Sequence, residues 1–254
     1  MALPASQVWI CDGESGLMDS ALRLWTRAFE ESLRARGVFC AALSGGKTPI
    51  PFYRELARQR RTDFREKTHL FLVDERFGPP GHPESNGRMI AEALVLPAGL
   101  PDENWHPIPL GADSAEESAL LYEGGLRDFF RLNRGEFPAF DFVLLGIGGD
   151  GHTASLFPKT PALEENQQAA VAVNLEAPRG SRVTLTLPVL NRGRMVVFLT
   201  RGEEKAEIVR KVIWEKDPAL PAVRVRPAVF LVDRAAGREL PSAVGEKNMG
   251  NVSV

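Results

Sequence analysis

The feature that most constrains the fold is an alternation of short apolar runs with helical patterns along the chain. The runs are rich in β-branched and aromatic residues. Several are apolar on both faces, as strands are when helices cover both sides of a sheet. Strands are therefore expected over 8–11, 38–43, 69–74, 140–147, 169–174, 182–187, 195–200 and 228–233. This alternation predicts an α/β protein with a three-layer, mostly parallel, Rossmann-like sheet and helices on both faces.

Five segments between these runs are expected to be helical. In the first, apolar side chains recur at three- and four-residue spacing, and Gly37 follows as a plausible C-cap. The second has Pro49 near its first position, where proline is favoured. The first of these helices has its apolar residues at 17, 21, 24, 25, 28 and 29, and the other four cover 49–60, 84–95, 114–132 and 203–215.

One stretch, 182–200, departs from the strand–helix rhythm. Its two apolar runs lie close together around a turn led by Pro188, and a small antiparallel addition to the sheet would explain this. No Gly/Ser-rich linker or internal repeat divides the chain. We therefore expect one α/β domain over residues 1–254, with room for a small lobe in the middle third and a frayed tail at 245–254.

Composition argues against several classes of partner. The net charge is −2 with acidic and basic residues mixed, so no basic field favours nucleic acid or a membrane surface. Cys11 and Cys40 lie in apolar runs without metal-ligand spacing, which favours buried thiols. There is no leader-like N-terminus and no run of 18 apolar residues. We expect a cytoplasmic protein with reduced thiols.

Ligands of a mostly parallel sheet bind beyond the carboxyl ends of its strands, so the residues there are candidate site residues. The run 38–43 is followed by Ser44, Gly45, Gly46, Lys47 and Thr48. Consecutive glycines before a helix N-terminus suit an anion, although an ordinary tight turn has the same pattern. It is not a Walker A loop, because the first glycine of that motif is missing.

Two further strand ends carry charges. After 69–74, Arg76 would clamp a phosphate with Asp74 orienting it, and Asn86 opens the next helix; a solvated charge cluster is the alternative. Lys205 lies in the first turn of helix 203–215, against the helix dipole. It either points at an anionic ligand or is an ordinary exposed lysine.

The fourth strand end, LLGIGGDGHTASLFP at 144–158, matches the dinucleotide pattern G-x-G-x-x-G. That interpretation requires a long helix and an acidic residue about 20 residues later. Pro158 interrupts the helix, and no acid stands at the required place, so we reject it. Instead, His152 follows Asp150 at a strand end, a setting suited to general base catalysis, although a lone histidine is often structural.

Five segments occur in the order and approximate spacing typical of the 6-phosphogluconolactonase family. They are LSGGKTP, LVDERFGPPGHPESN, FDFVLLGIGGDGHTASLFP, LTLPVLNRGR and TRGEEKA, and they span residues 43–206. The continuation Thr153–Pro158 resembles the lactonase form, and not that of the sister glucosamine-6-phosphate deaminases and isomerases. Two departures are Lys47, where the family usually has a small hydroxyl residue, and a final segment that looks short.

The resemblance implies an open sheet of the deaminase/ribose-5-phosphate-isomerase type, in a lactonase without metal or organic cofactor. The implied reaction is hydrolysis of 6-phospho-D-glucono-1,5-lactone in the oxidative pentose phosphate pathway. By the family pattern, His152 is the general base and Asp150 supports it. The substrate and its phosphate would be held by Ser44, Gly45, Gly46, Lys47, Thr48, Asp74, Arg76, Asn86, Gly148, Gly151 and Lys205. How these residues divide the task stays open.

The chain has no G-x-S-x-G nucleophile elbow, so direct attack by water is favoured over an acyl-enzyme. Two alternatives remain: an amino-sugar-phosphate deaminase or isomerase on the same fold, and a non-enzymatic sugar-phosphate-binding protein. In each case the expected partner is a small molecule, and the expected state is a monomer or weak homo-oligomer without nucleic acid or membrane.

Overall fold

A computed structural model describes residues 6–59, 62–79, 81–177, 179–242 and 244, so the tail expected to fray lies outside the described residues. The main sheet has seven strands in the order β1-β10-β9-β6-β2-β3-β5, and every neighbouring pair is parallel. Its strands are β1 (Gln7–Cys11), β2 (Phe39–Leu43), β3 (Thr68–Leu72), β5 (Trp105–His106), β6 (Phe142–Leu145), β9 (Val196–Thr200) and β10 (Val229–Asp233). The prediction of a mostly parallel sheet is confirmed.

A second sheet of three antiparallel strands has the order β4-β8-β7. Its strands are β4 (Asp74–Arg76), β7 (Ala170–Asn174) and β8 (Ser181–Leu185). The antiparallel addition is thus confirmed, but its composition differs from the expectation. The two runs around Pro188 do not pair, because α7 (Leu187–Leu190) separates β8 in the second sheet from β9 in the main sheet.

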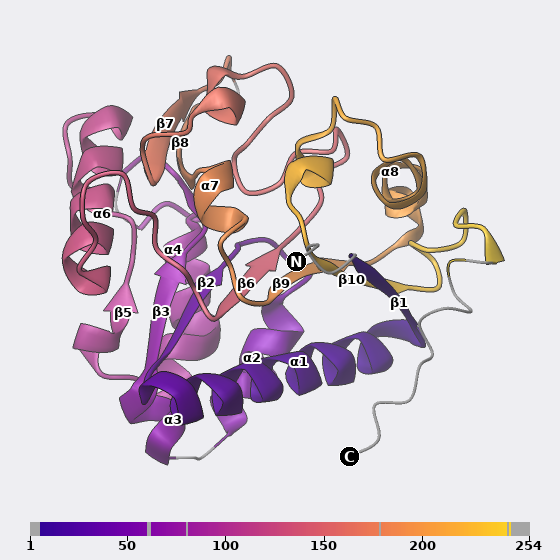
Figure 1. The fold of residues 1–254 in the computed structure, drawn as a ribbon, viewed down its shortest axis with the longest axis horizontal. Helices are drawn as coiled ribbons and strands as arrows, with labels where there is room; N and C mark the ends of the chain where they lie inside the picture. The colour runs from indigo at the N-terminus through magenta and orange to yellow at the C-terminus, as the bar shows by residue number, and fades with distance from the viewer. Residues whose placement is uncertain (1–5, 60–61, 80, 178, 243, 245–254) are drawn as a thin grey trace.

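Helices cover both faces of the main sheet, with α1 and α2 below it and α7, α8 and the second sheet above it in Figure 1. The α-helices are α1 (Gly13–Arg36), α2 (Ile50–Arg58), α3 (Thr62–Lys67), α4 (Asn86–Ile90), α5 (Leu96–Ala98), α6 (Ala115–Phe130) and α8 (Ala206–Arg210). Shorter turns of 3₁₀ or π type are η1 (Ala91–Val95), η2 (Asp102–Asn104), η3 (Pro161–Glu164), η4 (Glu203–Lys205), η5 (Lys211–Glu215) and η6 (Pro221–Arg224). None of the described helices is long and apolar enough to cross a bilayer.

Aromatic packing fixes α1 against the sheet. Trp25 is almost completely buried, and its ring meets Phe39 of β2 and Phe142 of β6 edge-on, with centroids 4.8 and 5.1 Å apart. The helix ends where the sequence predicts, at Gly37, whose φ of 72° is left-handed and whose N–H donates to the Leu33 carbonyl. This packing holds the centre of the sheet, from which the site strands project.

Two histidines, His69 of β3 and His106 of β5, lie in contact at the edge of the main sheet. His69 Nδ1 lies 3.1 Å from His106 Nε2, and the Phe71 ring stacks on His106. Burial, with the His69 charge next, lowers the pKa of His106 to about 4, and burial also lowers the pKa of His69. Both histidines are therefore held neutral in the folded chain.

We expect acid to destabilise the fold through this pair. In the unfolded chain both histidines have a pKa near 6.5 and bind protons below that pH, whereas in the folded chain they stay neutral to lower pH. The free energy of unfolding is therefore highest above pH 6.5 and decreases as the pH falls toward 4. At pH 5 the loss attributable to His106 is about 1–2 kcal/mol. Urea unfolding at pH 7.5 and 5.0 measures it. His106→Phe should show a smaller loss than the wild type, and an equal loss in both would contradict the assignment.

Candidate active site

The carboxyl ends of β2, β4, β6 and β9 border a single cavity of about 450 Å³. This is the position that the strand-end rule predicts for a ligand of a parallel sheet. Ten of the residues singled out from the sequence line its wall: Ser44, Gly45, Gly46, Thr48, Asp74, Arg76, Asn86, Gly148, His152 and Lys205. Residues separated by more than 150 positions in the chain thus meet in one site.

Glycines in the loop after β6 bring His152 to the cavity wall. The Gly148 N–H donates to the His152 carbonyl at 2.8 Å, and the Gly151 N–H donates to the Gly148 carbonyl at 3.0 Å. A Cβ on Gly148 would lie only 2.1 Å from the imidazole ring, and Gly151 has a φ of 79°. The described residues between β6 and β7 include no α-helix, which agrees with rejecting the dinucleotide motif.

Asp150 lies behind His152 and orients its ring. The Asp150 carboxylate lies 2.5 Å from His152 Nδ1 and also accepts the His152 backbone N–H at 3.2 Å. Burial raises the pKa of Asp150, but the hydrogen bond and the charge of His152 outweigh it, so that pKa lies below its ordinary value. An ionised partner on Nδ1 favours the tautomer protonated there and leaves Nε2 as the proton acceptor.

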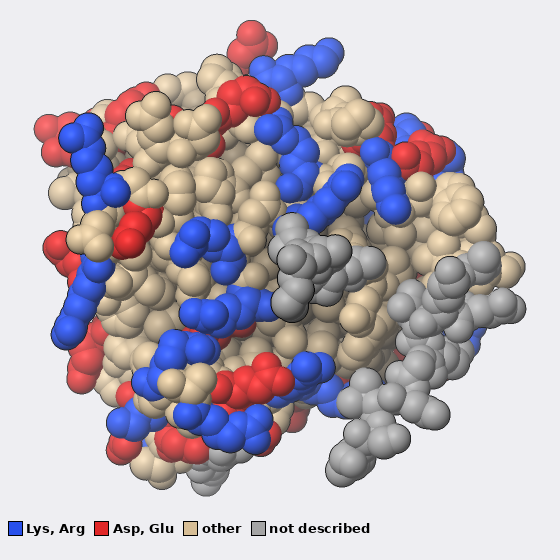
Figure 2. All heavy atoms as spheres, viewed as in Figure 1, with Lys and Arg blue, Asp and Glu red and all other residues tan. Residues whose placement is uncertain are grey.

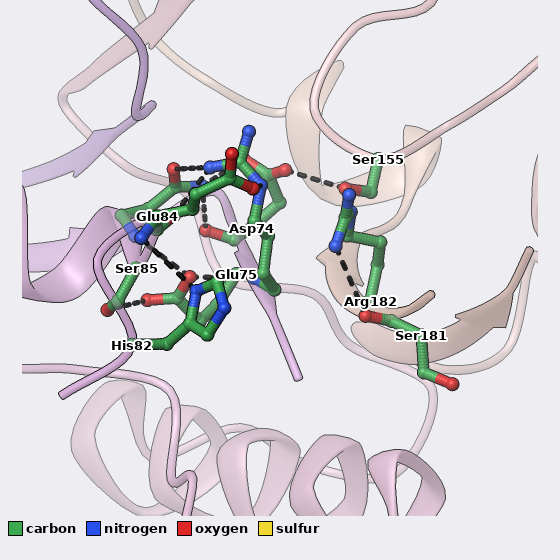
Figure 3. Close-up of polar contacts among 10 residues, drawn as sticks. Asp74, Glu75, His82, Glu84, Ser85, Ser155, Ser181 and Arg182 are labelled. Carbon is green, nitrogen blue, oxygen red and sulfur yellow. Dashed lines mark hydrogen bonds and ion pairs between the residues drawn. The ribbon is translucent and has the colours of Figure 1, made fainter. Parts of the chain in front are cut away.

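Asp74 joins the His152 loop to the second sheet. Ser155 Oγ donates to the Asp74 carboxylate at 2.6 Å, and Asn86 Nδ2 donates to the Asp74 carbonyl at 2.9 Å. Figure 3 shows Ser155 pointing toward Asp74 in this arrangement. Burial raises the pKa of Asp74 above its ordinary value, although the Ser155 hydrogen bond opposes the shift. Ser155 was not among the residues predicted to form the site.

The glycine-rich turn after β2 meets the loop after β4. A Cβ on Gly45 would lie 1.8 Å from Asn86 Oδ1, so only glycine allows the two loops to approach this closely. Arg76 Nη1 donates to the Glu84 carbonyl at 2.5 Å and lies 3.4 Å from Asn86 Oδ1. The predicted association of the turn, Arg76 and Asn86 is therefore seen in the fold.

Three polar groups of the wall have few partners among the described residues. Lys205 Nζ donates to the Ile147 carbonyl at 2.9 Å and forms no ion pair with a described residue, so its charge is available to a ligand. Ser44 Oγ and Thr200 Oγ1 are buried and have no hydrogen-bond partner among the described residues. Both oxygen atoms are closed off from the cavity by the atoms around them, so a bound molecule would reach them only after a local rearrangement.

Not every predicted residue lies on the wall. The side chain of Lys47 is exposed and is not part of the cavity lining, and Gly151 lies behind the His152 loop, where its added Cβ would meet Leu220 at 2.7 Å. Neither residue therefore lines the cavity, and their part in substrate binding stays a prediction. Conversely, Arg179, Arg182 and Arg201 line the cavity but were not predicted to bind substrate.

The charge of the wall suits a small anion. Five basic side chains line it: Arg76, Arg179, Arg182, Arg201 and Lys205. On the face shown in Figure 2, basic and acidic side chains are interspersed and form no continuous field of one sign. In the part of the chain that the structure describes, no three His, Cys, Asp or Glu side chains are grouped so that they could hold a metal ion.

Comparison with known proteins identifies relatives of this arrangement. The family model described as glucosamine-6-phosphate isomerases/6-phosphogluconolactonase matches residues 12–232. A 6-phosphogluconolactonase of Synechocystis is 40% identical over 241 residues, which cover 93% of this chain and 99% of that protein. A solved 6-phosphogluconolactonase from Trypanosoma cruzi has a TM-score of 0.83 at 27% identity, covering 94% of this chain and 98% of the other. A monomeric glucosamine-6-phosphate deaminase, 21% identical over 92% of this chain and 99% of its own, shares the fold with a TM-score of 0.77.

Proposed function

The chain belongs to the family of glucosamine-6-phosphate isomerases and 6-phosphogluconolactonases, and we propose that it is a lactonase of the oxidative pentose phosphate pathway. It hydrolyses 6-phospho-D-glucono-1,5-lactone to 6-phospho-D-gluconate. The observation that carries this proposal is His152, with the Asp150 carboxylate on Nδ1, on the wall of a cavity lined by basic side chains. Hydrolysis of the lactone requires a base that activates water, and the phosphate of the substrate requires positively charged side chains that bind it.

In the proposed mechanism, His152 Nε2 takes a proton from water as the water oxygen attacks the lactone carbonyl carbon. The carbonyl oxygen then carries the negative charge of a tetrahedral intermediate. When this intermediate collapses, the bond from the carbonyl carbon to the ring oxygen breaks, and the proton held by His152 passes to that ring oxygen. Asp150 stabilises the imidazolium between the two transfers, as its low pKa allows.

Attack by water, and not by a protein nucleophile, fits the surroundings of the candidate groups. Ser155 Oγ donates to Asp74 and not to His152, so the proposed general base does not activate it. Cys11 and Cys40 are buried, and burial raises the pKa of Cys40 to about 12, so neither thiol is suited to attack a substrate.

The phosphate supplies binding energy remote from the bond that breaks. Such energy orients the ring over His152 and so contributes to the rate. The Ser44–Gly46 turn, Arg76 and Lys205 line the same cavity as His152, which supports a shared role in holding the substrate. We further propose that the protein acts in the cytoplasm as a single α/β domain, monomeric or weakly self-associating.

A direct assay tests the reaction class. Purified protein should accelerate acid release from freshly made 6-phosphogluconolactone above the spontaneous rate, and a chelator should leave that rate unchanged. It should release no ammonia from glucosamine 6-phosphate. Acid release no faster than the blank would overturn the lactonase proposal, and ammonia release would favour the deaminase alternative on the same fold.

A further inference from the structure

Two arginines stand directly opposite each other in the second sheet. In the antiparallel pairing of β4 with β8, Arg76 is the register partner of Arg182, one pair along from Glu75 and Val183. Side chains at directly opposite positions share one face of the sheet, with Cβ atoms about 4.5–5.5 Å apart. Like charges placed there destabilise the pairing. The two guanidinium groups therefore form an arrangement that the fold alone does not favour.

No carboxylate of the described residues is in direct contact with Arg182. Its side chain is partly buried, and within the described residues it forms no ion pair; its one hydrogen bond goes from Nη1 to the Ser181 carbonyl at 3.5 Å. Figure 3 shows this contact on the strand beside Ser155. Burial and then the charge of Arg76 lower the pKa of Arg182, and the charges of Asp74, Glu84 and Glu75 oppose this shift only in part.

The nearby acids are already engaged. The Asp74 carboxylate accepts from Ser155, and the Glu84 carboxylate lies 3.5 Å from Arg76 Nε. Among the other arginines of the wall, Arg179 pairs with Asp150 and Arg201 pairs with Glu14. Arg182 is thus the arginine of the described wall whose charge is left without a carboxylate.

We propose that Arg182 and Arg76 form a two-arginine clamp for the phosphate of the substrate. A phosphate monoester carries nearly two negative charges and accepts paired N–H donors from guanidinium groups, so it turns the repulsive pair into a favourable one. Both arginines belong to the second sheet, whereas His152 lies in the loop after β6. The phosphate therefore lies at the second sheet and the lactone carbonyl lies toward His152.

This inference rests on the proposed function and assigns the binding of the substrate phosphate to Arg182 and Arg76. Its test is Arg182→Gln, with Arg182→Lys as the conservative variant and Arg192→Gln, at an exposed position outside the cavity lining, as the matched control. Arg182→Gln should raise KM for 6-phosphogluconolactone by about 10- to 100-fold, the range for a lost charge-assisted contact, and change kcat by less than about threefold. The KM of Arg182→Lys should lie between those of the wild type and Arg182→Gln. An ammonium group keeps the positive charge but lacks the paired N–H donors of a guanidinium group.

The unphosphorylated substrate separates a phosphate clamp from a structural role. For glucono-1,5-lactone, kcat/KM of Arg182→Gln should equal that of the wild type. Equal losses on both lactones, or no loss on either, would overturn the clamp. Without ligand, the variant should melt no lower than the wild type, because the substitution removes a like-charge contact.

A binding measurement keeps the clamp testable even if the lactonase assignment fails. Calorimetric titration with 6-phosphogluconate should show binding to the wild type and a 10- to 100-fold weaker affinity for Arg182→Gln. If neither lactone is hydrolysed but this loss is seen, the proposed reaction is wrong and the phosphate clamp stands. Equal affinities in wild type and variant would overturn the clamp whatever the activity.

Discussion

Replacing His152 with glutamine is expected to lower kcat for 6-phosphogluconolactone by about 10²–10⁴-fold, the usual contribution of a positioned general base. Glutamine preserves bulk and polarity but cannot take the proton that water must lose. The donors and cations of the cavity remain, so the expected activity is low but above the spontaneous rate. Initial rates of acid release over a range of pH measure the effect.

His82 provides the matched control for this experiment. It is an exposed histidine in the loop before α4, outside the cavity lining, and its ring accepts the Glu84 backbone N–H at 3.2 Å. Because the glutamine side chain can also accept a hydrogen bond, His82→Gln should keep the wild-type rate within about twofold. Far-ultraviolet circular dichroism would establish that the His152 variant is folded. A folded His152→Gln protein with full activity would mean that the base lies elsewhere and that His152 is structural.

The sequence was sufficient to locate His152 because its position depends on local rules. A strand end, the glycines around it and a preceding Asp are all visible within ten residues, and parallel topology brings such ends together. The same rule located Ser44, Arg76 and Lys205, which lie on the wall of the cavity. Strand ends therefore predicted ten of the residues that line this cavity without any knowledge of the packing.

Arg182 was missed because the strand-end rule considers only the carboxyl ends of strands. In an antiparallel pair, the start of one strand lies beside the carboxyl end of the other. Arg182 lies near the start of β8, and only the antiparallel pairing with β4 brings that start beside the carboxyl end at Arg76. β4 itself has three residues and its partner lies about a hundred positions away, so neither length nor periodicity indicates the pairing. Register between such distant segments is set by packing that one sequence does not display.

The turn after β2 shows a different limit. Its glycines and its lysine look equally suited to an anion in the sequence, yet Gly45 lies against Asn86, whereas Lys47 is exposed. The direction of each side chain depends on the path of the chain between β2 and α2. A motif therefore identifies the loop as functional more reliably than it identifies the residues within it that line the site.

A large loss of stability is expected from Glu75→Ala, at a residue that no motif indicated. The Glu75 side chain is 1% exposed, and its carboxylate accepts from four donors at 2.7–2.9 Å: the backbone N–H groups of Arg76, Asn86 and Gly87 and the hydroxyl of Ser85. Three of these donors belong to the start of α4, so the carboxylate joins that helix to β4. Alanine would leave them buried and unpaired. The expected cost is about 3–5 kcal/mol of unfolding free energy, measured by urea denaturation.

Glu92→Ala is the control, because Glu92 follows α4 and forms only an exposed pair with Arg88, worth less than about 1 kcal/mol. The Glu75 variant should also bind substrate more weakly, because Arg76 and Asn86 lose the group that fixes the backbone between them. In the folded fraction of the variant, the fold increase in KM should therefore exceed the fold decrease in kcat. A loss no larger than that of Glu92→Ala would show that water or rearranged backbone replaces the carboxylate, and that the β4–α4 connection does not depend on Glu75. The expected result would instead mean that a buried structural carboxylate, not a ligand-binding group, keeps the phosphate side of the cavity in place.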